Sequence, residues 1–274
     1  MKKIFILLLA VLMLSLCFTG CGQGAASDTQ ETAGVSETAS GGVSAPAEES
    51  AAVSDMPVSG AGTPAESYTA FVKAKSAVIT KLSDGLSKNK STVFASMTLL
   101  GASMADLVML PVSFFGAGGE AASTGLKMLN ASDVQYSENG NTYSITYTDE
   151  QGDTYVFNGT YDAAADALAC TAQKAGKDFF YSEYRRTSYG YVSQYYFIND
   201  DDTTSLYQFA ISGEDGTFGV STTQASQPAA LTGSEAADFP AALPEWYSIQ
   251  GSVITGLMSD GTEIDFEYEP SVTE

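Results

Sequence analysis

An alternation with a period of two recurs over residues 133–223 and 247–268, on either side of a polar, proline-containing excursion at 224–244, and it narrows the possible folds more than any other feature. Large side chains such as Tyr143, Ile145 and Tyr147 are separated by threonine and serine. Successive side chains of a β-strand point to opposite faces of a sheet, so the pattern predicts strands with one buried face. Short turns such as Asn139-Gly140 separate the runs, and short turns join antiparallel neighbours. The segment therefore predicts a curved antiparallel meander of about 8–10 strands.

A helical periodicity precedes the strands. Thr63-Pro64-Ala65-Glu66 has the pattern of an N-cap, a first-turn proline and a capping-box glutamate. Apolar residues then recur at helical spacing and predict a helix over 64–88. A second, more apolar helix is expected over 91–110, and a short third one over about 120–129.

The order of these elements predicts the fold class. Helices over about 64–130 followed by a sheet over about 133–268 indicate an α+β domain, with two to three N-terminal helices packed on the meander. The second helix contains Asp106 and is followed by Pro111, which argues against a membrane span. We expect this helix to lie buried under the sheet.

The face of the first helix opposite its apolar residues carries four lysines: Lys73, Lys75, Lys81 and Lys88. A positive stripe on an acidic protein is suited to contact an anionic lipid or wall polymer. The simpler expectation is a solvated helix face whose cations balance nearby acids.

The first 21 residues carry an export signal. Lys2 and Lys3 precede an apolar run, Ile4–Leu16, which is too short to span a bilayer and has the length of a signal-peptide core. The next residues, Phe18-Thr19-Gly20-Cys21, resemble the lipobox of bacterial lipoprotein precursors, although Phe18 stands where that family usually has leucine.

The resemblance implies a lipid anchor. In that family a diacylglyceryl group is attached to the cysteine, here Cys21, and a peptidase cuts just before it. The expected product is an acylated protein on the extracytoplasmic face of the cell membrane, after removal of a 1–20 signal peptide. Two alternatives remain open: secretory cleavage after Ala26, and an uncut helical anchor.

A tether is expected between the anchor and the fold. Residues 22–62 are dominated by Ala, Ser, Gly, Thr and Glu, with no aromatic residue, Lys or Arg. Such a segment buries too little apolar surface to offset its chain entropy, so disorder is predicted. The expected organisation is signal peptide 1–20, lipidated cysteine and tether 21–62, and one globular domain 63–274. Such tethers resemble those of Gram-positive surface lipoproteins.

Composition excludes several functions. Loss of Lys2 and Lys3 with the signal leaves ten basic and 33 acidic residues, a formal charge of −23. Such a surface repels nucleic acid and anionic headgroups, so membrane attachment depends on the lipid and no nucleic-acid partner is expected. The chain has no histidine, which excludes Ser-His-Asp and Cys-His catalysis and histidine-ligated metals. No cofactor is predicted.

Two further features carry no catalytic or metal site in our interpretation. Cys170 is the one cysteine of the predicted domain and is expected to be buried and unreactive. The acidic turn 199–202 has oxygen ligands suited to Ca²⁺ but lacks the glycine and distal glutamate of an EF-hand loop, so a solvated turn is expected.

Tyrosines cluster in the middle strands and are the candidate ligand-binding residues: Tyr184, Tyr191, Tyr195 and Tyr207. A tyrosine ring has an apolar body and a polar tip, so the cluster is suited to stack sugars or peptides. Ordinary cross-strand packing is the alternative.

These observations favour a non-enzymatic, surface-anchored module that binds a small apolar, glycan or protein ligand. Lipid-carrier half-barrels of the Lol type have a similar plan of sheet and helices, although no residue motif supports a relationship. One alternative is a histidine-free hydrolase that uses paired carboxylates on surface or extracellular glycan. Another is a structural partner in a surface complex. An apolar cavity between sheet and second helix would favour the carrier.

Overall fold

The computed structural model of the protein describes residues 62–89, 91–199, 201–222 and 225–269. The predicted signal peptide, Cys21 and nearly all of the tether lie outside these ranges. The helical elements are α2 (Pro64–Lys88), α3 (Val93–Val108), the 3-10 helix η1 (Leu110–Phe114), α4 (Gly119–Lys127) and the 3-10 helix η2 (Phe239–Ala242). The strands are β1 (Ser132–Asn139), β2 (Thr142–Thr148), β3 (Thr154–Asp162), β4 (Ala167–Lys174), β5 (Lys177–Arg186), β6 (Tyr191–Ile198), β7 (Thr204–Ser212), β8 (Asp215–Ser221), β9 (Glu245–Gln250), β10 (Val253–Leu257) and β11 (Glu263–Glu267).

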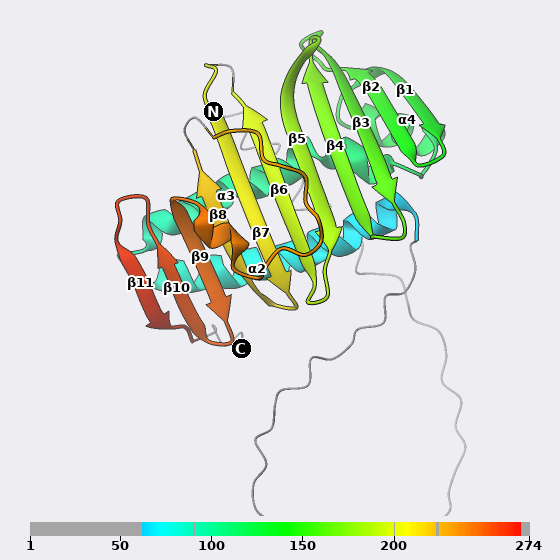
Figure 1. Ribbon diagram of the computed structural model, residues 1–274. Helices are drawn as coiled ribbons and strands as arrows, with labels where there is room; N and C mark the ends of the chain where they lie inside the picture. The colour runs from blue at the N-terminus through cyan, green and yellow to red at the C-terminus, as the bar shows by residue number, and fades with distance from the viewer. Residues whose placement is uncertain (1–61, 90, 200, 223–224, 270–274) are drawn as a thin grey trace, which may run out of the picture. The chain divides into compact units, whose positions relative to one another are not determined.

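The α+β fold predicted from the sequence is confirmed. The described strands form one sheet of eleven in chain order, antiparallel throughout, with β1 and β11 at its edges (Figure 1). The count exceeds the predicted range because the stretch of chain after the strap at 225–243 forms two strands, β9 and β10, where the sequence pattern predicts one. Gly251 turns the chain between them with a φ of 59°, a left-handed value that glycine adopts without steric cost.

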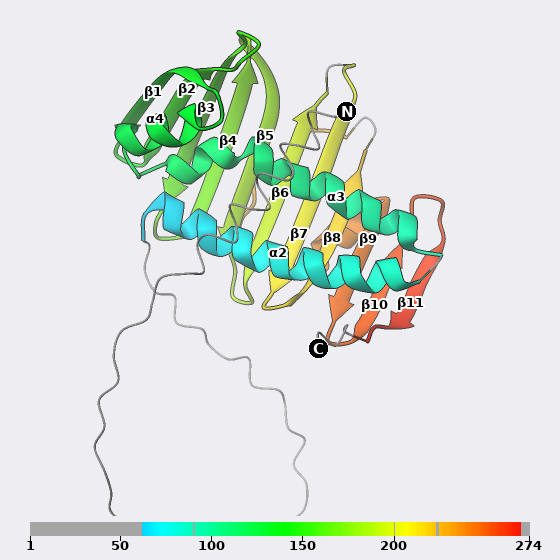
Figure 2. The ribbon, with the colours of Figure 1, turned by 180° about the vertical axis from the view of Figure 1, so that it is seen from behind.

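Helices α2 and α3 lie side by side across one face of the sheet, which we call the inner face (Figure 2). The predicted capping box begins α2. The Glu66 backbone N–H donates to Thr63 Oγ1 at 3.3 Å, and the Thr63 N–H donates to Glu66 Oε2 at 2.8 Å. The apolar side of α2 then packs on the inner face of the strands, and both supply the main core. None of the described helices combines the length and the apolar composition needed to cross a membrane.

The expectation that the second helix lies fully buried is wrong in part. The side of α3 that carries the small residues Ala95, Ala102 and Ala105 is buried. On its other side Met97 is 63% exposed and Leu100 is 52% exposed. Helix α3 packs beside α2, so only one side of it is covered. An apolar strip on α3 therefore faces solvent.

The opposite, outer face of the sheet is covered over part of its width. Residues 225–243, which we call the outer strap, run in front of β5–β8 (Figure 1). Gln194 Nε2 donates to the Ala229 carbonyl at 2.7 Å, and the Leu231 N–H donates to Glu183 Oε2 at 2.9 Å. Glu183 is 5% exposed and also accepts from Tyr181 at 2.7 Å. A buried carboxylate thus ties the strap to β5.

Candidate functional site

The four tyrosines singled out in the sequence all lie on the inner face, where helices cover the sheet. Tyr184, Tyr191 and Tyr195 are buried and Tyr207 is partly buried. The ring of Tyr184 stacks on Phe71 of α2, with centroids 4.4 Å apart and planes inclined by 6°. Their rings contact other core side chains, so they pack as the alternative of ordinary cross-strand packing predicts.

Two of these tyrosines meet in a polar cluster around Asp166. Tyr191 donates to Asp166 Oδ2 at 3.3 Å, and Arg186 Nη1 donates to the Tyr191 hydroxyl at 2.9 Å. Ser67 of α2 donates to Asp166 Oδ1 and lies 2.7 Å from the Tyr184 hydroxyl. This cluster joins the first turns of α2 to β5 and β6. It satisfies buried polar groups, which is a structural task.

Tyr195 belongs to a second polar cluster, built on Lys75. The expectation that Lys75 lies in a solvated stripe is wrong: its side chain is fully buried. Its ammonium pairs with the Asp106 carboxylate of α3, donates to the Tyr195 hydroxyl at 2.9 Å and lies 4.4 Å from the Tyr195 ring centroid. Burial lowers the pKa of Lys75, and the Asp106 carboxylate opposes that shift. The cluster ties α2, α3 and β6 together.

An apolar groove opens near the end of α3. It has a volume of about 280 Å³ and lies between the α3–η1 junction, the end of α4 and the inner face of β2, β3 and β5. Leu107, Val108 and Leu110 line the helical side. The sequence alternation identified the strand residues as buried ones, but no local signal marks a gap between them and the helices.

Aromatic side chains form the sheet side of this groove. Tyr147 and Tyr155 stack with centroids 5.2 Å apart and planes inclined by 8°. Phe179 meets Tyr155 and Phe157 edge to face. Burial is the main reason that the pKa of the Tyr147 phenol is raised, so this hydroxyl stays neutral at physiological pH. The groove thus offers apolar ring faces with few polar groups.

The rim of the groove is both apolar and acidic. Leu129 lines it and is 44% exposed, while the neighbouring Met128 is 74% exposed and is not among the lining residues. Leu107 of the groove continues along α3 into the exposed strip of Leu100 and Met97, at helical spacing of seven and three residues. Asp149 is the one carboxylate among the described lining residues.

Other acidic groups in hollows are already engaged. Glu66 and Glu138 both line an open hollow beside the start of α2. Glu66 is held by the capping box, and Glu138 accepts from Tyr136 at 2.7 Å. Within the described ranges no three Cys, Asp or Glu side chains gather closely enough to hold a metal. In the turn at 199–202, Thr203 donates to the exposed Asp201 and lowers its pKa, while Asp200 lies outside the described residues.

Cys170 is buried, and burial raises the pKa of its thiol, as expected for an unreactive core residue.

Comparisons of the chain with protein-family models, curated proteins and solved structures found no match.

Proposed function

We propose that this chain is a lipid-anchored extracytoplasmic binding protein whose groove between helices and sheet takes a small apolar ligand. The observation that carries the proposal is the groove itself: an opening of about 280 Å³ lined by aromatic and aliphatic side chains. Ligand sites are concave and mostly apolar, with a few polar groups. The exposed strip on α3 leads from solvent to this groove and supplies an apolar path for entry.

The hydrolase alternative gains no support from the groove. Glycoside hydrolysis uses two carboxylates about 5–9.5 Å apart across a bound sugar. Asp149 stands without a second carboxylate among the described lining residues, and the aromatic wall has few groups that hydrogen-bond a sugar. A carrier or sensor of an apolar molecule needs neither a carboxylate pair nor groups that hydrogen-bond a sugar.

The anchor is tested at Cys21. In cells labelled with a radioactive or alkyne fatty acid, the wild-type protein should carry the label and sediment with membranes. The Cys21→Ser variant should carry no label, because serine has no thiol for the acyl-glyceryl group. A Cys170→Ser variant is the control and should keep the label. Equal labelling of wild type and Cys21→Ser would contradict the anchor and leave the groove proposal standing.

The groove is tested with an uncharged fluorescent probe, N-phenyl-1-naphthylamine, on protein prepared without its lipid anchor. The wild-type domain should bind the probe. Leu129→Glu should weaken binding about tenfold, because it removes roughly half of the apolar contact energy of a buried leucine and places a charge at the rim of the groove. Met128→Glu introduces the same charge one residue away, outside the lining, and should bind as wild type does. Equal effects of the two substitutions would point to a charge effect rather than a groove.

A further inference from the structure

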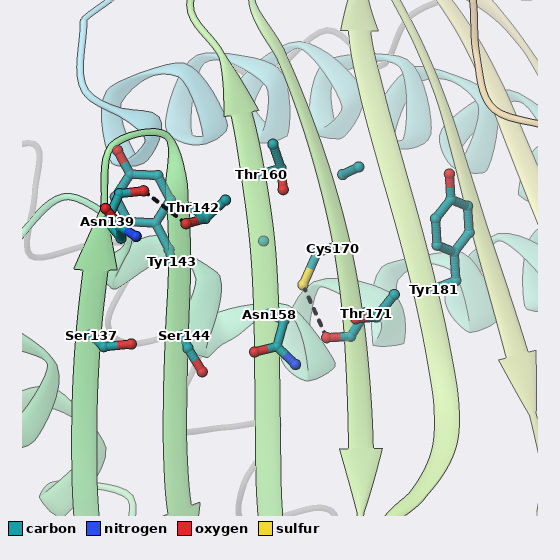
Figure 3. A pocket seen from close by; sticks show the side chains of 12 residues that line it. Ser137, Asn139, Thr142, Tyr143, Ser144, Asn158, Thr160, Cys170, Thr171 and Tyr181 are labelled. Carbon is teal, nitrogen blue, oxygen red and sulfur yellow. Dashed lines mark hydrogen bonds between the residues drawn. The ribbon is translucent and has the colours of Figure 1, made fainter.

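A second hollow lies on the outer face of the sheet, on the side away from the helices (Figure 3). It has a volume of about 360 Å³ and lies over β1–β5. The outer strap covers this face only from β5 onward, where its Leu231 packs on Val192 and Ala210. Over β1–β4 the same face is open (Figure 1). The strap thus covers the outer face over β5–β7 and leaves the polar surface over β1–β4 uncovered.

Polar side chains stand in register across the open half. One row runs Ser137, Ser144, Asn158 and Thr171 on β1 to β4 and ends at Tyr181 on β5. Neighbouring strands lie about 4.8 Å apart, so the row repeats a hydroxyl or amide at that spacing. The register therefore builds a line of hydrogen-bonding groups at right angles to the strands.

A second row runs beside the first. It contains Asn139, Thr142 and Thr160, one pleat or about 6.7 Å further along the strands, and it ends at the small Ala169. Thr142 donates to the Asn139 carbonyl at 2.8 Å.

The first-row side chains are free to bind a ligand. Ser137, Ser144, Asn158 and Thr171 make no side-chain hydrogen bond to another described residue. The exception is the end of the row, where the Tyr181 hydroxyl is held by Glu183 beneath the strap. The phenol ring is thereby fixed at the border of the hollow, where Figure 3 shows it.

Charge narrows the class of ligand. All twelve described residues that line the hollow are uncharged, on a chain whose formal net charge is −21. An ordinary solvated surface has roughly a quarter to a third of charged residues. An anionic polymer would meet no cation here and would be repelled by the rest of the surface. An apolar ligand would leave the hydroxyls and amides without partners.

We propose that this outer hollow is a binding site for an uncharged glycan chain. Sugar hydroxyls both donate and accept hydrogen bonds, as serine, threonine and asparagine side chains do, so the two rows are able to pair with several hydroxyls at once. The Tyr181 ring supplies an apolar flank for the C–H face of a pyranose. This site and the apolar groove lie on opposite faces of the sheet. The two are therefore separate, and each proposal stands if the other fails.

The test is calorimetric titration of the full-length protein in detergent micelles with cellohexaose, xylohexaose and mannohexaose, and with the acidic hexagalacturonate. At least one uncharged hexasaccharide should bind and the acidic one should not. The double variant Asn158→Ala/Thr171→Ala should weaken that binding roughly tenfold or more, because it removes two hydrogen-bonding groups from the first row. Thr255→Ala, a threonine of β10 outside the hollow, is the matched control and should bind as wild type does.

Both altered positions are exposed, so the double variant should keep the circular dichroism spectrum and unfolding temperature of the wild type. Absence of binding to all three uncharged hexasaccharides at millimolar concentration would overturn the proposal. Equal binding of hexagalacturonate, or a folded double variant that binds as well as wild type, would also overturn it.

Discussion

Lys75 is a charged residue in surroundings that disfavour charge, because a lysine ammonium is normally hydrated and this one is buried. Its ammonium is fully buried in the core, whereas its partner Asp106 keeps 25% of its side chain exposed. Removal of one partner of a buried ion pair leaves an uncompensated buried charge. The free energy lost in this way is larger than the net stabilisation that the intact pair provides. The two partners of this pair are therefore not equivalent.

We expect Asp106→Ala to lower the free energy of unfolding by about 3–5 kcal/mol, because the buried Lys75 charge loses its counter-ion. Lys75→Met should cost less, since the partly exposed Asp106 carboxylate is able to turn to water. Lys81→Met is the control: the ion pair of Lys81 with Asp215 is partly exposed on both sides and should contribute about 0–1 kcal/mol. Urea unfolding at neutral pH measures all three. A larger loss in Lys75→Met than in Asp106→Ala would contradict the account of the pair.

Among the elements, the outer strap is attached in part through one buried carboxylate, Glu183 of β5. Glu183 accepts from Leu231 of the strap, from Gln194 at 3.2 Å and from Tyr181. The strap itself is mostly irregular backbone, with η2 as its short helical part. Its attachment to β5 therefore rests on this buried carboxylate.

Glu183→Ala should loosen the strap while the helices stay in place. Hydrogen bonds to a charged group contribute about 1.5–3 kcal/mol each, and three would be lost together. We expect faster proteolysis within residues 225–243 and a lower unfolding temperature. Glu214→Ala, an exposed substitution in the turn between β7 and β8, should show neither. Unchanged proteolysis of Glu183→Ala would show that other contacts hold the strap.

The sequence predicted the elements well because their signals are local. The alternation around Tyr143 and Ile145 identified the strands, and the capping box identified the first residue of α2. The burial of Lys75 also had a signal, since it follows Phe71 by four residues and precedes Val78 by three, on the apolar side of α2. At this position the helical spacing of the apolar residues predicts burial, and the charge of the lysine does not prevent it.

The sites were harder to predict because they depend on distances between elements. The groove exists because the α3–η1 junction around Leu110 stands away from Tyr147 and Tyr155, and no residue type encodes that gap. The Asp106 partner of Lys75 is 31 residues away in the chain. The spacing of the tyrosines predicts a cluster on the sheet, but it does not distinguish a covered sheet face from an open one.

At the scale of the whole molecule, most of the described groups whose pKa the fold clearly shifts are tyrosines. The chain has fifteen tyrosines and no histidine, the side chain whose ordinary pKa lies near 6.5. In the folded protein the pKa values of Tyr136, Tyr189 and Tyr268 are raised to about 12, in each case mainly by burial. Their ordinary value is 10.0.

Stability should therefore fall in alkali. Below pH 10 these phenols are protonated in both states, so their contribution to stability is fully present. Between pH 10 and about pH 12 the unfolded chain loses the protons more readily, so the free energy of unfolding decreases as pH rises. Thermal unfolding followed by circular dichroism should show a falling midpoint above about pH 10. A midpoint that rises over this interval would contradict the burial of the phenols.

The binding groove is the central claim, and mass spectrometry of material that co-purifies with the domain tests it most directly. The domain is purified without detergent from cells that express it without its anchor, and an organic extract is analysed. We predict one class of apolar molecule at close to one per protein, and much less of it on the Leu129→Glu variant than on Met128→Glu. An extract that holds no apolar molecule, or equal amounts on the two variants, would contradict the claim.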